Sequence, residues 1–296
     1  MNASGSSAVS DFIADSPQVI STKTPSVRVL RTRYGLNDLY KYTGDRKKFQ
    51  KAISDFYYIN IIGAKWSQTK SFHNFLSDIK RIALRKKKGN VGEPEKARKI
   101  ISQPYGYLAL EAFERFARIT LENDDIKNAF ENAVGDFVFN YLVAASGEDP
   151  GKSRILATRN FFRLPNINKE LLKFMGDYRY IAVTRSPHTQ YASLLRDGRV
   201  KGPKDFLRMR EISLNSMNYN LQCGDFDKSR FLHVEFEDFV DNHLCRANVA
   251  DFVGVEVEKI IPKRFNPRES SRNTVLNNFT LSDEDYNLIN CAIGKK

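Results

Sequence analysis

The stretch RYIAVTRSPHTQYASLL, residues 179–195, predicts a strand that leads directly into a helix. Its apolar run YIAVT has the length and the β-branched content of a buried strand. Pro187 favours the first turn of a helix, because its missing N–H and fixed φ suit that position. Arg185 is therefore expected where the strand ends and the helix begins.

Three other short apolar runs have the same character: SVRVL near Val29, RILAT from Arg154 and RFLHVE from Arg230. Stretches long enough to hold helices separate them, which favours a parallel sheet. We therefore predict a three-layer α/β fold, with a parallel central sheet flanked by helices.

The middle of the chain has helical periodicity instead. Apolar residues from Ile126 to Leu142 recur at i, i+3, i+4 and i+7, behind the capping candidates Asn123 and Asp124. Weaker ladders run through residues 49–56, 72–83 and 110–117. We interpret the chain as a single domain, residues 1–296, with a helical insertion at about 45–145.

Composition points to a globular chain with an anionic partner or substrate. The 296 residues are 41% hydrophobic, and 47 Lys+Arg against 35 Asp+Glu give a net charge of +12. Much of the excess lies in Arg46–Lys51 and Lys80–Lys99. Such runs usually form solvated faces or loops, and no zinc-finger or RNP-type motif accompanies them.

Several classes of protein are not expected. The sequence has no apolar run of 18 residues and no signal-peptide pattern at its start, so we expect a cytoplasmic chain without an integral membrane segment. The three cysteines have no CxxC spacing and the four histidines no paired spacing. We therefore expect neither a disulfide framework nor a metal site.

Two segments have the composition of phosphate-binding turns. In NASGSSAVSDFI, residues 2–13, Gly5 allows close approach of an anion just before an amphipathic helix. Arg185 presents a planar fork, and Ser193 lies two turns into the next helix. The alternatives are a frayed terminus for the first segment and a structural ion pair for Arg185.

Together these segments resemble the sulfotransferases that use 3′-phosphoadenosine 5′-phosphosulfate (PAPS), a P-loop-like family, and in particular its bacterial or carbohydrate-type members. The turn SGSSA matches the family's 5′-phosphosulfate loop, and Arg185 and Ser193, with Pro187 between them, match its 3′-phosphate site. Phe236 in RFLHVEFEDFVDN takes the place of an adenine-stacking aromatic, and RESSRNT, residues 268–274, the place of a loop over the 3′-phosphate. The resemblance implies these nucleotide-binding residues: Ser4, Gly5, Ser6, Ser7, Ala8, Arg185, Ser193, Phe236, Arg272 and Asn273.

The chain departs from the family's pattern at two catalytic positions. Ala3 stands where many members have Lys or Arg, and Arg159 where cytosolic members have the histidine base. We expect Arg33 or Lys23 to supply the missing cation. We expect Arg159 and Asn160 to contact the sulfuryl group or the acceptor. Glu111 is the candidate base.

The family's loop-feeding strand would precede Met1, so an upstream extension is expected to stabilise the chain. The resemblance implies transfer of a sulfuryl group from PAPS to a hydroxyl acceptor, with 3′,5′-bisphosphoadenosine (PAP) as product and no metal. The basic charge favours a glycan or another anionic polymer as acceptor. We expect no nucleic-acid partner.

Three alternatives to this function are open. The first is a sulfotransferase-like nucleotide-binding protein without activity. The second is a nucleotide kinase, which would need a lysine that this loop lacks. The third is a basic nucleic-acid-binding protein, whose binding would depend steeply on salt.

Overall fold

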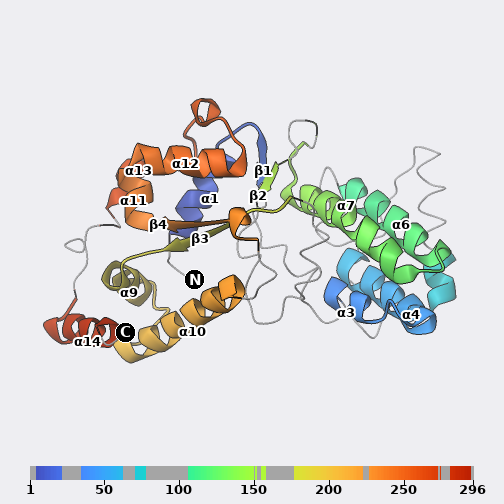
Figure 1. Cartoon of the computed structure of the whole chain (residues 1–296), viewed down its shortest axis with the longest axis horizontal. Coiled ribbons are helices and arrows are strands. Elements are labelled where there is room, and N and C mark those ends of the chain that lie inside the picture. The colour runs from blue at the N-terminus through green and yellow to red at the C-terminus, as the bar shows by residue number, and fades with distance from the viewer. Residues whose placement is uncertain are drawn as a thin grey trace. The chain divides into compact units, whose positions relative to one another are not determined.

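The computed structural model describes residues 5–21, 35–62, 71–77, 106–149, 151, 155–157, 177–222, 227–272, 274 and 281–294 (Figure 1). The chain divides into two compact units. Unit 1 comprises Met1–Val19 and Tyr178–Lys296, and unit 2 comprises Ile20–Asp177. The described residues are mostly helical, with two small two-stranded sheets. Among the described helices, none is long and apolar enough to cross a membrane.

Unit 1 is built around a parallel pair of strands. Strand β3 (Tyr180–Thr184) lies beside the parallel strand β4 (Phe231–Glu235) (Figure 1). Thr184 is paired with Glu235 at the carboxyl ends of both strands. The described helices of this unit are α1 (Ser6–Ala14), α9 (Pro187–Arg196), α10 (Pro203–Gln222), α11 (Phe236–Asp241), α12 (His243–Val253), α13 (Pro267–Ser271) and α14 (Asp283–Ile293), with 3₁₀ turns at η4 (Lys228–Arg230) and η5 (Val257–Lys259).

The second sheet pairs β1 (Val19–Ser21) with β2 (Ile155–Ala157). The structure confirms the predicted strand YIAVT, its parallel partner and a helix that begins at Pro187. The strand expected near Val29 lies outside the described residues. The full three-layer sheet stays a prediction.

The described residues of unit 2 outside the small sheet are mostly helical, and they have an aromatic core. Its described helices are α3 (Leu36–Lys41), α4 (Arg46–Phe56), the π-helix η1 (Tyr57–Ile62), residues 72–77, α6 (Gly106–Glu122) and α7 (Ile126–Ser146). Phe56 stacks on Phe113, and Phe116 stacks on Phe137, with ring centroids 5.6 and 5.3 Å apart. The predicted helical middle is confirmed for these residues.

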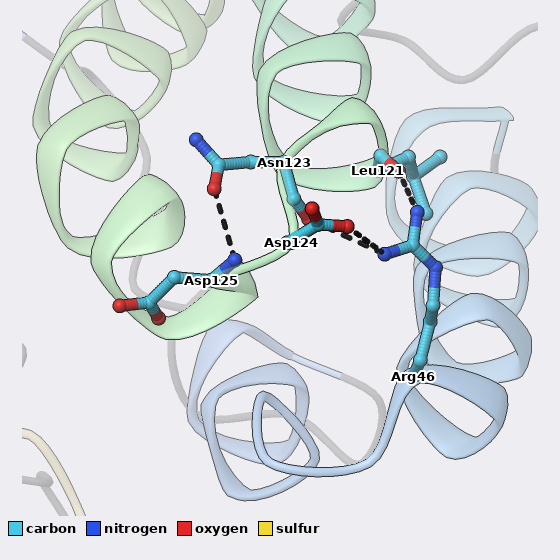
Figure 2. Close-up of polar contacts among 5 residues, drawn as sticks. All are labelled: Arg46, Leu121, Asn123, Asp124 and Asp125. Carbon is cyan, nitrogen blue, oxygen red and sulfur yellow. Dashed lines mark hydrogen bonds and ion pairs between the residues drawn. The ribbon is translucent and has the colours of Figure 1, made fainter.

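The turn between α6 and α7 corrects the predicted cap of α7 and contains the hydrogen-bond partners of Arg46. Asp125, not Asn123 or Asp124, caps α7 by accepting from the N–H of Asn128. Asn123 instead accepts from the N–H of Asp125 (Figure 2). Arg46, from the start of α4, donates to the carbonyl oxygens of Leu121 at 2.6 Å and Asn123 at 3.4 Å.

Replacing Arg46 with alanine is expected to destabilise unit 2 by about 1 kcal/mol. The guanidinium satisfies carbonyls at the end of α6, where a positive charge also complements the helix dipole. Its ion pair with the fully exposed Asp124, at 3.6 Å, contributes little. Denaturant unfolding checks this, with the exposed Lys47→Ala as control. An equal loss in Asp124→Ala would show that the ion pair dominates.

Candidate functional site

Three segments from distant parts of the sequence meet at the carboxyl end of β3. Gly5 precedes α1 with φ +87°, and a Cβ atom added there would lie 2.1 Å from Cδ2 of Phe236. On the same Phe236, the guanidinium carbon of Arg185 lies 5.2 Å from the ring centroid. Helix α1 also contacts β3. The structure therefore brings together the three predicted nucleotide-binding segments that contain Gly5, Arg185 and Phe236.

Arg185 is a buried cation, only 6% exposed. Burial lowers its pKa to about 10, while the negative charge of Glu237 raises it. The guanidinium is thus protonated at neutral pH. Its Nε donates to Oγ1 of Thr189 at 3.1 Å, and this bond fixes the plane of the guanidinium relative to α9.

Glu237 is a site residue that sequence reasoning missed. Its Oε1 accepts from the backbone N–H of Ser186 at 3.1 Å and lies 3.2 Å from Oγ1 of Thr189. The predicted parallel strands YIAVT and RFLHVE could have revealed Glu237. Once Thr184 lies opposite Glu235, the residues that follow each strand become neighbours.

Ser193 is 7% exposed on a helix that is held from two sides. About one turn earlier in α9, Gln190 accepts from Nη1 of Arg210 on α10 at 3.1 Å. Burial lowers the pKa of Arg210, a second cation near this helix that the sequence did not reveal. On the other side, Tyr191 donates to Asp285 of α14 at 2.8 Å. Burial and this bond raise the pKa of Tyr191 to about 12.

Helix α1 is tied to the segment that leads to α13. Asp15, which is 6% exposed, accepts from the backbone N–H groups of Lys263, Arg264 and Phe265, all at 2.9–3.0 Å. The ring of Phe12 packs edge-on against Phe265, with centroids 5.8 Å apart. The predicted RESSRNT loop corresponds to α13 and the residues after it, and α13 contacts α11.

The remaining predicted residues are distributed as follows. Ser6, Ser7 and Ala8 form the first turn of α1, and Arg272 is exposed just after α13. Glu111 lies on α6 in unit 2, and its role as base stays a prediction. Outside the described residues lie Ser4, Lys23, Arg33, Arg159, Asn160 and Asn273.

Phe236 was predicted to stack on adenine, and the structure gives it different surroundings. The ring is 4% exposed and packs against both Gly5 and Arg185. In this conformation it supports the site from within, and a base could reach it only after these neighbours moved. Its observed contacts are those of a residue that positions the glycine turn and the arginine.

The basic run at Arg46–Lys51 makes mostly local contacts. Lys48 pairs with Asp45 at 3.1 Å, Lys51 pairs with Asp55 at 3.2 Å, and Arg46 contacts the end of α6. These contacts favour the interpretation of this run as a solvated helix face. The second run, Lys80–Lys99, lies outside the described residues.

Comparison with known proteins gave no relative of this chain. No model of a known protein family matches it, and neither does any curated protein or solved structure.

Proposed function

We propose that unit 1 binds PAPS and that the chain transfers its sulfuryl group to a hydroxyl acceptor, a glycan or another anionic polymer. The observation that carries this proposal is the buried Arg185 at the end of a parallel strand. Open parallel sheets bind their ligands at this edge. Arg185 also contacts the aromatic ring against which the glycine turn of α1 packs.

A phosphate group suits the surroundings of Arg185. A guanidinium binds phosphate through two parallel hydrogen bonds, and Nε of Arg185 is already oriented by Thr189. Ser193, buried two turns along α9, would add a hydroxyl donor. In this proposal the two side chains hold the 3′-phosphate, and Phe236 positions the arginine.

The start of α1 suits the 5′-phosphosulfate. The first amides of a helix point outward along its axis, and the helix dipole favours negative charge at this end. Gly5, in the left-handed region, opens the turn before Ser6, Ser7 and Ala8. Arg272 and Asn273 would complete the nucleotide-binding set from the segment after α13.

The donor supplies an activated sulfuryl group. During transfer the acceptor oxygen bonds to sulfur, the bond from sulfur to the 5′-phosphate oxygen breaks, and the acceptor proton passes to a base. Negative charge then grows on the departing phosphate, where the amides of α1 would stabilise it. The roles of Glu111 as base, Arg33 as added cation and Arg159 and Asn160 as acceptor contacts stay predictions from the sequence. No metal takes part in the proposed transfer.

Replacing Arg185 with alanine is expected to weaken PAP binding by about 1.5–3 kcal/mol, roughly 10- to 150-fold in Kd, because a hydrogen-bonded charge is lost. Calorimetric titration with PAP measures this. Arg199→Ala is the matched control, since Arg199 is an exposed arginine paired with Asp197 just after the same helix. Unfolding curves of each variant verify that the fold is retained.

Unchanged PAP affinity in Arg185→Ala would refute the 3′-phosphate assignment. Binding of PAP without sulfuryl transfer to any hydroxyl acceptor would instead favour a nucleotide-binding protein that lacks activity. Absence of PAP binding, together with steeply salt-dependent binding of DNA or RNA, would favour the nucleic-acid alternative.

A further inference from the structure

A carboxylate occupies the place where helix α9 would attract an anion. Helix α9 begins at Pro187, and Ser186 is its N-cap residue. Oε1 of Glu237 accepts from the Ser186 N–H at 3.1 Å and lies 3.2 Å from Oγ1 of Thr189. A negative group at this position is stabilised by the helix dipole, as a phosphate would be.

The same carboxylate acts on the buried arginine. Thr189 Oγ1 accepts from Nε of Arg185 at 3.1 Å, so one hydroxyl contacts both charged side chains. The attraction of Glu237 raises the pKa of Arg185 against the effect of burial. Glu237 therefore compensates part of the charge of Arg185 when no nucleotide is bound.

We propose that Glu237 is the internal counter-anion of the donor site, with which an incoming phosphate competes for Arg185 and the start of α9. This inference rests on the proposed donor site and concerns its regulation. The carboxylate and the proposed 3′-phosphate are both attracted to Arg185, and the dipole of α9 favours a negative charge near the Ser186 N–H. Glu237 thus lowers the affinity for PAP while it preserves the site in the free protein.

The test is Glu237→Gln, which keeps the shape and the Oε1 acceptor but removes the charge. PAP is expected to bind about three- to tenfold more tightly, because repulsion between two anions is relieved. Asp238→Asn is the matched control: it removes the same charge from the next residue of α11, which is exposed. The gain should disappear in the Arg185→Ala background, and it should be small for adenosine 5′-monophosphate, which lacks the 3′-phosphate.

The outcomes separate this inference from the proposed function. Unchanged or weaker PAP binding by Glu237→Gln, with normal binding by the parent, would overturn the counter-anion alone. An equal gain in Asp238→Asn would overturn it too, because net charge would then explain the effect. A parent that binds no PAP would overturn the donor site and this inference together. If the glutamine variant does not fold, Glu237→Asp withdraws the charge from Arg185, and its PAP affinity should also rise; an unchanged value would refute the proposal.

Discussion

Replacement of Gly5 with alanine is expected to destabilise unit 1 by about 2–5 kcal/mol and to abolish the PAP binding that we propose for this unit. The new Cβ would lie 2.1 Å from Cδ2 and 2.4 Å from Cγ of Phe236, a buried ring that is also in contact with Arg185. The φ of +87° adds backbone strain for any residue with a side chain. Denaturant unfolding and calorimetry with PAP measure the two effects.

Gly198 offers a matched control for this prediction. Its φ is +64°, also left-handed, but an added Cβ would meet nothing within 4 Å. Gly198→Ala should therefore show only the strain term, about 1–2 kcal/mol. In a Phe236→Ala background the clash is absent, so adding Gly5→Ala there should cost less stability than it does in the parent protein. Equal losses for the two single glycine variants would mean that Phe236 does not pack against Gly5.

Replacing Asp15 with alanine is expected to cost about 2–4 kcal/mol of unit 1 stability. The carboxylate accepts from three consecutive N–H groups, those of Lys263, Arg264 and Phe265. Its loss leaves these donors without that acceptor beside a buried aromatic ring. Hydrogen exchange should then show faster exchange at these three amides, and denaturant unfolding should show the loss of stability.

Asp251 provides the comparison for Asp15. It is an exposed aspartate on α12 of the same unit, and Asp251→Ala should change stability by no more than about 0.5 kcal/mol. Asp15→Asn keeps one acceptor oxygen, so its loss of stability should lie between those of Asp15→Ala and Asp251→Ala. A stability for Asp15→Ala close to that of Asp251→Ala would contradict the role of Asp15 as an anchor.

Local sequence patterns were sufficient for the elements that bury an apolar face. YIAVT, the helix that begins at Pro187 and the ladder from Ile126 all formed as predicted, because each pattern records which side of the element faces the core. The prediction for the cap of α7 was wrong, because the cap is Asp125 and not Asn123 or Asp124. Three consecutive polar residues, Asn123, Asp124 and Asp125, could each cap a helix, and only the three-dimensional turn selects among them.

Part of the candidate site was also predictable. Arg185 and the glycine turn were identified from the residues that follow a strand or precede a helix. Asp15 could not be found in this way, because its partners lie 248–250 residues away. Its contacts depend on how the chain returns to α1, which no local pattern records. Glu237 lay between these cases, since the β3–β4 register could have revealed it.

The division of the chain affects the order in which its parts can form during synthesis. Unit 1 takes its first segment, Met1–Val19, from one end of the chain and the rest from Tyr178 onward, with unit 2 between them. At ribosomal rates of about 5–20 residues per second, α1 emerges on the order of ten seconds or more before β3 exists. Unit 2, whose contacts lie within a continuous segment, can fold during that interval. Until β3 has been synthesised, Phe12 would stay exposed and could bind chaperones. Slower translation of residues 20–177 should lengthen this interval.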